Sequence, residues 1–224
     1  MVTRPLFKGV LHAFTALLYI IAIPYLAARI PNKLRWPIGT YLVSIISHLV
    51  ISSCLHLTSW SPGMETLHLL TRRLDHIMIF LAIAATYYAA IVTVLNDISR
   101  FVIYFLSMGI ILGIITRVWF TDAPQIIIAL PYIMMGWALM LDTSVPSKLL
   151  DRLPVGSMIA LFGGISYTIG ALIYAMKYPN PYPMYIGFHE LFHICSTIGT
   201  ILFTIVIFNY AIPYYINTHN KEPI

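Results

Sequence analysis

Charged side chains are scarce in this chain of 224 residues. Only 9% of the residues are Asp, Glu, Lys or Arg, whereas 59% are hydrophobic. A soluble domain carries about 25% charged residues, and no polar stretch here is long enough to fold alone. Several apolar runs reach the length of about 20 residues that a membrane-spanning helix needs. We therefore expect an all-α integral membrane protein with one domain, residues 1–224.

Basic clusters and a cysteine framework are also lacking. The formal net charge is +5, but Lys and Arg are scattered at the ends of apolar runs, which suits anionic lipid headgroups and not nucleic acid. The two cysteines, Cys54 and Cys195, lie inside apolar runs and are interpreted as small packing residues. The last apolar run contains no Lys, which excludes a retinal Schiff base in that segment.

Seven apolar runs make up most of the chain. They are too long and continuous for the strands of a closed barrel, so we predict a bundle of seven transmembrane helices. Lys and Arg divide evenly between the two sides of this topology, so the positive-inside rule assigns no orientation. The predicted spans are Leu6–Ala28, Trp36–Leu57, Leu74–Val94, Phe101–Trp119, Ala123–Leu141, Val155–Met176 and Met184–Tyr210.

Four of the ionisable residues inside these runs stand out, and an ionisable residue in a span costs about 2.5–3.5 kcal/mol on insertion scales. His56 ends the second run, Asp75 begins the third, and His189 and His193 begin the seventh. In a serpentine of seven helices these positions face the same side as the N-terminus. The topology alone therefore predicts that all four lie at one membrane depth.

The types and spacing of these residues predict an intramembrane metal site. His189 and His193 are four residues apart, on one face of a helix and about 6 Å apart along it. With His56 they form a three-histidine set that leaves one position open on a zinc ion, the pattern of catalytic sites. We expect Asp75 to hold or deprotonate a water molecule that zinc activates. Ser52, one turn before His56, is expected to hydrogen-bond a ligand or the substrate.

A plainer interpretation stays open for each histidine by itself, because a membrane histidine often only hydrogen-bonds a neighbouring helix. His48, two turns before His56, is interpreted as a buried hydrogen bond, with a place in the same cavity as the alternative. His12, His68 and His76 lie near the ends of runs, so we expect them to contact solvent or lipid headgroups.

Several of these segments resemble motifs of the haemolysin III and adiponectin/progestin receptor (PAQR) superfamily, and of its haemolysin III branch in particular. Ser52–His56 is similar to the S-x-x-x-H motif, and His189–His193 is similar to the H-x-x-x-H motif. The Leu-Asp-His of Arg73–His76 and the later Ile83–Tyr87 resemble the "LDH…IAGTY" segment. The remaining similarity is to the start of the first span and rests on Arg4, Pro5, Gly9 and His12.

The resemblance implies seven helices, a cytoplasmic N-terminus and one zinc ion near the cytoplasmic side. It assigns Asp75 a place near the zinc-bound water, and it implies as zinc ligands His56, His189 and His193. Some members hydrolyse lipid amides such as ceramide, some respond to hormones, and some are named for haemolysis. This chain departs from the family pattern with Ala85 in place of Gly and Tyr88-Ala89 in place of Thr-Pro, which affects helix packing and not the ligands.

The leading functional hypothesis is a zinc-dependent hydrolase of lipid amides or esters, with a membrane lipid as its substrate. A second enzyme hypothesis is an intramembrane metalloprotease, because His189–His193 reads H-E-x-x-H with Glu190 in the place of the general base. A third hypothesis is non-enzymatic: a receptor, a pore or a scaffold in which zinc ties the second span to the seventh.

Overall fold

The computed structural model describes residues 7, 9–95, 98, 100–119, 124–182 and 184–219. The secondary-structure elements in these ranges are all helices. Six of the helices are long and apolar enough to cross a membrane. The chain is therefore an all-helical, multi-pass integral membrane protein. These six helices are α1 (Val10–Ala28), α2 (Arg35–Leu57), α3 (Glu65–Thr93), α4 (Arg100–Trp119), α7 (Pro154–Met176) and α8 (Phe188–Val206), which continues through the π-helical η3 (Ile207–Ala211) into α9 (Ile212–His219).

The fifth predicted span differs from the other six. It forms a shorter apolar helix of 12 residues, α5 (Gln125–Gly136), followed by a single 3-10 turn, η2 (Ala138–Leu141). Its predicted start at Ala123, like that of the first span at Leu6, lies outside the described residues. The helix ends at Gly136, a residue that weakens helices because its backbone loses more freedom on folding than that of other residues.

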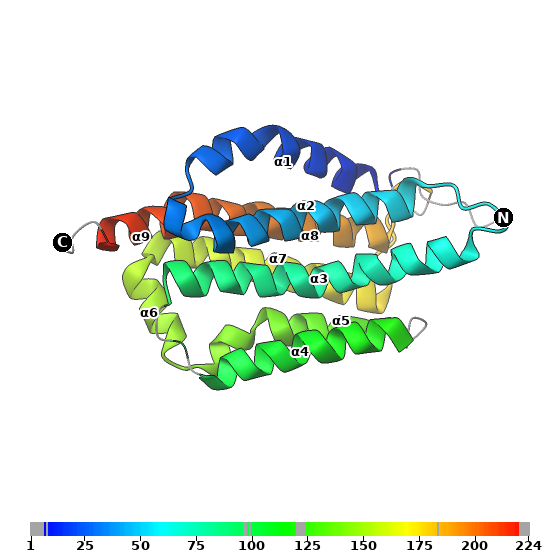
Figure 1. The fold of residues 1–224 in the computed structure, drawn as a ribbon. Coiled ribbons are helices and arrows are strands. Elements are labelled where there is room, and N and C mark those ends of the chain that lie inside the picture. Colours follow the sequence, from blue (N-terminus) through cyan, green and yellow to red (C-terminus); the bar gives the residue numbers. More distant parts are fainter. Residues whose placement is uncertain are drawn as a thin grey trace.

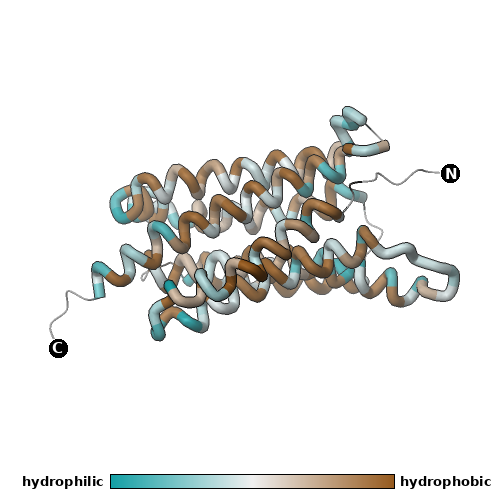
Figure 2. Tube along the Cα trace, turned by 90° about the horizontal axis from the view of Figure 1, so that it is seen from above, coloured by the Kyte–Doolittle hydropathy of each residue, from teal (hydrophilic) through white to brown (hydrophobic). Residues whose placement is uncertain are grey.

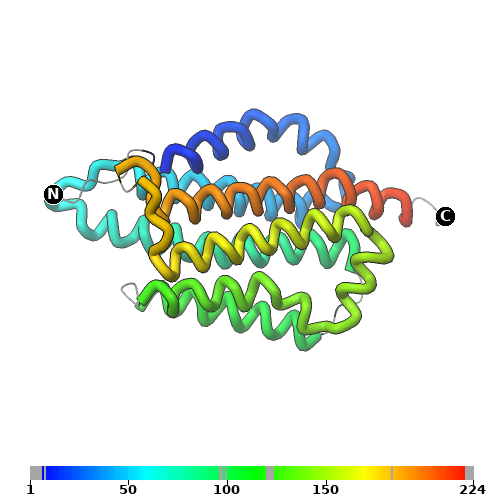
Figure 3. Tube along the Cα trace, turned by 180° about the vertical axis from the view of Figure 1, so that it is seen from behind, coloured from blue at the N-terminus to red at the C-terminus, as the bar shows by residue number. Residues whose placement is uncertain are grey.

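The helices run roughly lengthwise along one bundle (Figure 1). The most extensive packing joins α7 to α8 and α2 to α3. Helix α1 covers α2 and α8 on one edge, whereas α4 and α5 lie on the opposite edge, against α3 and α7 (Figures 1 and 3). The short helix α6 (Val145–Arg152) crosses one end of the bundle.

The two ends of the bundle hold different segments. The start of α1, the connection between α2 and α3, and the start of α8 lie at one end, whereas α9 lies at the other (Figures 1 and 3). The end of α2 and the starts of α3 and α8 therefore meet at the same end, as the predicted topology requires. This end is the one that holds the four ionisable residues.

Apolar side chains are abundant both inside and outside this bundle. Tyr41 and Ile38 of α2 are completely buried in a cluster with α1, α3 and η3, and Phe80 of α3 belongs to a second cluster with α4 and α5. On the outer surface, large apolar residues such as Ile21 and Ile126 are exposed. Figure 2 shows hydrophobic colour along the helices and hydrophilic colour mainly at their ends. Such a surface fits a lipid environment, in which apolar side chains face outward.

A hydroxyl group of α8 joins α1 and α2 inside this core. The Thr204 hydroxyl donates to the Thr200 carbonyl at 2.9 Å, and its oxygen lies 2.5 Å from the Tyr19 hydroxyl and 2.7 Å from the Tyr41 hydroxyl. Because the Thr204 proton is already used, both tyrosines donate to the Thr204 oxygen. Buried hydrogen bonds of this kind hold helices together in a membrane, where water offers no alternative partner.

Candidate metal centre

Three histidines from two helices converge at the end of the bundle where α2 ends and α8 begins. The ring nitrogens that His56, His189 and His193 offer to a metal all lie within 4.8 Å of one another. The Nε2 atoms of His56 and His189 are 3.1 Å apart. The structure therefore brings together the three side chains that the sequence predicted as one set, although His56 and His189 are 133 positions apart in the chain.

Local structure explains how the two helices hold these rings. At the start of α8, the Gly187 backbone N–H donates to the Glu190 carboxylate at 2.7 Å, which caps the first turn. His189 and His193 follow at i and i+4, with ring centroids 4.6 Å apart. His56 lies in the last turn of α2, where the Trp60 indole N–H donates to the Leu55 carbonyl at 2.9 Å. Both helix ends are thus fixed beside the cluster.

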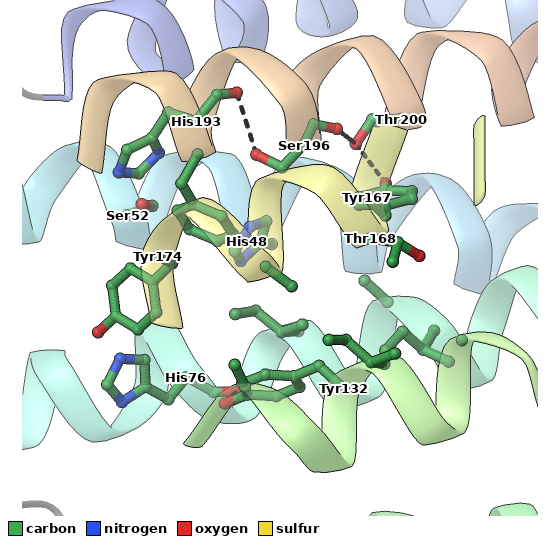
Figure 4. A pocket seen from close by; sticks show the side chains of 18 of the residues that line it. His48, Ser52, His76, Tyr132, Tyr167, Thr168, Tyr174, His193, Ser196 and Thr200 are labelled. Carbon is green, nitrogen blue, oxygen red and sulfur yellow. Dashed lines mark hydrogen bonds between the residues drawn. The ribbon is translucent and has the colours of Figure 1, made fainter. Parts of the chain in front are cut away.

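Asp75 and Ser52 lie in the wall of a cavity that also reaches His189 and His193. The cavity has a volume of about 140 Å³ and is lined by residues of α1, α2, α3, α5, α7 and α8. Asp75 is 7% exposed and Ser52 is 1% exposed. Figure 4 shows Ser52 and His193 at the same end of the cavity. The two predicted polar partners therefore line the same cavity as His189 and His193.

The three histidines lie close enough together to bind a metal ion. Nε2 of His193 is buried and has no hydrogen-bond partner among the described residues, whereas Nδ1 of the same ring lies 2.9 Å from the His12 ring. Two ligands of a tetrahedral zinc ion with bonds of about 2.0–2.1 Å are about 3.3 Å apart, close to the 3.1 Å between His56 and His189. Three imidazoles form a nitrogen donor set that suits zinc and several other transition metals.

Two histidines that were expected to contact solvent or headgroups line the cavity instead. His12 of α1 is only 1% exposed, and its ring centroid lies 4.0 Å from that of His193. His76 of α3 also lines the cavity, and its carbonyl accepts the Tyr132 hydroxyl at 3.1 Å. The expectation was wrong because these residues face inward, and position along a run does not reveal which face of the helix a residue occupies. His68 stacks on the Trp60 ring, with centroids 4.9 Å apart.

His48 lies in the same cavity, which was the alternative interpretation of this residue. It lines the cavity, and its Nδ1 is buried without a hydrogen-bond partner among the described residues. Its ring centroid lies 5.6 Å from that of His12. The structure therefore supports the alternative, in which His48 faces the same cavity as the cluster.

His12 is the residue of the site that reasoning from sequence missed, although the sequence held a signal for it. The start of the first span lies on the same side of the topology as the starts of the third and seventh. The argument that grouped His56, Asp75, His189 and His193 therefore applies to His12 as well. The structure confirms this grouping, with the His12 ring against His193.

Comparison with known proteins agrees with the motifs. The sequence profile of the family described as "Haemolysin-III related" matches residues 1–204, a range that includes the three histidines, Asp75 and Ser52. The chain is also similar to the Hemolysin-3 homolog of Bacillus subtilis (strain 168), with 24% identity over 178 residues that cover 76% of this chain and 79% of that protein. This chain therefore belongs to the haemolysin III-related family.

Proposed function

We propose that this protein is a zinc-dependent hydrolase of membrane lipids that carry an amide or ester bond, with ceramide-like lipids as the first class to test. One observation carries the proposal: three imidazole nitrogens converge within 4.8 Å of one another, and two of the three histidines, His189 and His193, line a cavity in the membrane domain. The proposed ligands are His56, His189 and His193. Three protein ligands leave one position open, which distinguishes a catalytic zinc site from a closed structural one.

A zinc ion held by His56, His189 and His193 would supply a Lewis acid and would lower the pKa of a bound water molecule to about 7. Asp75 is the proposed general base: its carboxylate accepts the proton of the attacking water and later passes it to the leaving amine or alkoxide. The position of Asp75 in the cavity wall with His189 and His193 supports this role.

Ser52 is the proposed hydrogen-bond donor to the substrate carbonyl. Its hydroxyl oxygen is buried and has no hydrogen-bond partner among the described residues. The neighbouring Ser53 instead donates to the Leu49 carbonyl at 2.6 Å. Of the two adjacent hydroxyls, Ser52 is the one with a proton available to a bound carbonyl in the cavity.

The rest of the cavity suits the hydrocarbon part of a lipid. Away from the histidines its wall includes apolar side chains from α3 and α5, such as Ile79, Ile83, Ile128 and Ile133. Burial of an apolar chain against such walls is favourable by about 0.8 kcal/mol for each CH₂ group. This lining supports a lipid as the partner and substrate, with its polar linkage at the histidine end.

We further propose that the chain crosses the membrane seven times, with its N-terminus on the cytoplasmic side as the family resemblance implies. Together α5 and η2 cover about 26 Å at 1.5 Å and 2.0 Å per residue, close to the hydrocarbon thickness of about 30 Å. The start of α1 and the end of α9 lie at opposite ends of the bundle, which supports an odd number of crossings (Figure 1).

The geometry disfavours the metalloprotease hypothesis. Glu190 is in the general-base position of H-E-x-x-H, yet its carboxylate accepts the Gly187 N–H at 2.7 Å and caps α8. A helix cap accounts for an acidic residue at this position. The scaffold hypothesis remains the alternative to hydrolysis, because the three ligands come from two helices that a metal would fasten together.

The test is metal analysis of the detergent-purified protein together with hydrolysis of ceramide in mixed micelles. We expect about one zinc per chain, lost when His56, His189 and His193 are all changed to Ala. The Asp75→Asn variant should keep zinc and lose turnover by about 10²-fold or more, whereas Glu190→Gln should stay near the activity of the unmodified protein.

The possible results separate the hypotheses. Absence of metal from both proteins in chelator-free buffer contradicts the zinc site and the hydrolase. Zinc in the unmodified protein without turnover of amide or ester lipids favours the scaffold. Full activity of Asp75→Asn removes its role as general base, and loss of activity in Glu190→Gln with zinc retained revives the metalloprotease.

A further inference from the structure

The start of α1 contacts a proposed ligand from each of the two ligand-bearing helices. Gly9 precedes α1 with φ +84°, and a Cβ atom at this position would lie 2.8 Å from Cβ of His56. One turn later, the His12 ring lies 2.9 Å from Nδ1 of His193. Helix α1 supplies no proposed ligand, yet it packs against both His56 of α2 and His193 of α8.

The Ser196 hydroxyl provides a basis for assigning the directions of the hydrogen bonds around His12. The Ser196 hydroxyl donates to the His193 carbonyl at 3.0 Å, so its oxygen is free to accept from Nε2–H of His12 at 3.4 Å. With its proton on Nε2, His12 has a lone pair on Nδ1 and can only accept there. Nδ1 of His193 lies 2.9 Å from both ring nitrogens of His12. Because Nε2 of His12 carries the proton in this assignment, Nδ1–H of His193 donates to Nδ1 of His12. Both imidazole rings are neutral in this set of hydrogen bonds among Ser196, His12 and His193.

This arrangement determines which nitrogen of His193 faces a metal. A neutral imidazole carries one proton, and here it lies on Nδ1, so the lone pair is on Nε2. Nε2 of His193 is buried and has no hydrogen-bond partner among the described residues, and His193 is one of the three clustered histidines. The tautomer of His193 that these hydrogen bonds favour is thus the one that offers Nε2 for metal binding.

We infer that His12 is a positioning residue of the metal site: it accepts a hydrogen bond from Nδ1–H of His193 and holds that ring in the metal-binding tautomer. The packing of α1 against α8 therefore influences metal affinity. The inference rests on the proposed metal site but not on hydrolysis. Outer partners of metal-bound histidines typically contribute 10–100-fold in metal affinity. In this chain the partner is a neutral imidazole from a third helix.

The experiment measures zinc affinity of the full-length purified protein by competition with a chromophoric chelator, with the visible spectrum of the Co²⁺-substituted protein as a second readout. His12→Leu removes the acceptor at similar volume, and we expect about 10–100-fold weaker zinc binding and a changed Co²⁺ spectrum. His12→Gln keeps an amide oxygen as acceptor and an amide N–H as donor, so it should recover most of the affinity.

His48→Leu is the matched control. It removes another buried histidine of the same cavity, whose ring lies 5.6 Å from that of His12, and it should leave zinc affinity within about twofold. Ser196→Ala provides a second variant should His12→Leu fail to fold, because it removes the acceptor that orients His12 together with the bond from Ser196 to the His193 backbone carbonyl, and leaves both histidine rings in place. We expect it to weaken zinc binding about threefold or more, less than the full effect of an outer partner.

Each result decides a separate point. Zinc affinity of His12→Leu within twofold of the unmodified protein overturns the inference, and so does equal loss in His12→Gln and His12→Leu. Unchanged affinity of Ser196→Ala overturns it when His12→Leu does not fold. A protein that binds zinc as expected and hydrolyses no lipid leaves the inference standing and removes the proposed hydrolase. A protein that binds no zinc overturns both.

Discussion

Ser52 and Ser53 show how two adjacent residues of one type have different environments. Ser53 donates to the Leu49 carbonyl of its own helix, a bond that is satisfied without any other element. Ser52 is 1% exposed, lines the cavity and lacks a hydrogen-bond partner among the described residues. A buried hydroxyl without a hydrogen-bond partner is unfavourable. A ligand bound in the cavity would supply the missing partner.

The two serines therefore form a matched pair of variants. We expect Ser52→Ala to lower kcat/KM for a lipid amide about 10-fold, since a hydrogen bond of about 1.4 kcal/mol in the transition state is lost. Zinc content should not change. Ser53→Ala should leave kcat/KM within twofold. Equal effects of the two changes on turnover would contradict the role of Ser52.

Gly9 provides a second test at the scale of one residue. Its positive φ costs a residue with a side chain about 1–2 kcal/mol, and a Cβ atom would also press on His56 at 2.8 Å. We expect Gly9→Ala to lower the midpoint of thermal unfolding in detergent and to weaken zinc binding. Gly63 is the control, because it has φ +93° but nothing within 4 Å of its Cβ position.

Gly63→Ala should cause the same backbone strain as Gly9→Ala and should leave the zinc affinity unchanged. A comparison of the two glycine variants thus isolates the contact with His56. The same loss of zinc affinity in both variants would show that Gly9 acts only through its backbone conformation.

Helix α1 is held to the bundle by polar contacts along its length. Near its start His12 meets His193, in its middle Tyr19 meets Thr204, and just after its end the Arg29 guanidinium donates to the Phe208 carbonyl at 2.9 Å. The last contact falls on the π-helical turn η3, where altered backbone hydrogen bonding is typical. These contacts explain how a helix with an apolar, exposed outer face keeps its register against α8.

A substitution of Thr204 tests whether its hydrogen bonds hold α1 and α2 against α8. Thr204→Val should destabilise the protein, because the Tyr41 hydroxyl loses its acceptor and the Tyr19 hydroxyl keeps only the long 3.5 Å bond to the Thr200 carbonyl. Each such bond contributes about 0.6–1.7 kcal/mol in a membrane protein. Thr40→Val is the control, since Thr40 bonds only carbonyls of its own helix, Trp36 and Pro37. Thermal unfolding in detergent measures the difference, and equal melting temperatures would contradict the network.

At the scale of the whole molecule, the bundle places the two sets of connections at opposite ends. Ser61, between α2 and α3, and Ser147 of α6 lie in segments at different ends of the bundle (Figure 1) and are both exposed. We expect Ser61→Cys and Ser147→Cys to react with a membrane-impermeant maleimide from opposite sides of sealed vesicles. The unmodified chain, with Cys54 in α2 and Cys195 in α8, measures background labelling.

Labelling of both introduced cysteines from one side would contradict the orientation of the bundle across the membrane. Labelling of Ser61→Cys from the cytoplasmic side would also support the cytoplasmic N-terminus, because the start of α1 lies at the same end (Figure 1).

Much of this architecture was predictable from the sequence. Long apolar runs must form helices in a membrane, because every backbone polar group has to be satisfied within its own segment. Chain order then requires consecutive spans to alternate in direction, and this alternation alone places His56, Asp75, His189 and His193 at one end. The i, i+4 spacing of His189 and His193 sets them on one helical face.

Other features depend on packing between helices. The sequence predicted a fifth span like the others, but the chain forms a shorter helix and a 3-10 turn there. It placed His12 and His76 in contact with solvent or headgroups, yet both line the cavity. Hydropathy records how apolar a run is, whereas the face that a helix turns inward depends on its neighbours.

The sequence by itself determined an all-helical membrane protein of the haemolysin III-related family and the three histidines that converge, because these follow from hydrophobicity, helical periodicity and chain direction. Only the tertiary structure decided that α1 seats His12 against His193, that Glu190 caps α8, and that Ser52 faces a cavity whereas Ser53 does not. The physical reason is that local rules act over a few residues, whereas the partner of a buried polar group is chosen by the rotation of each helix against all the others.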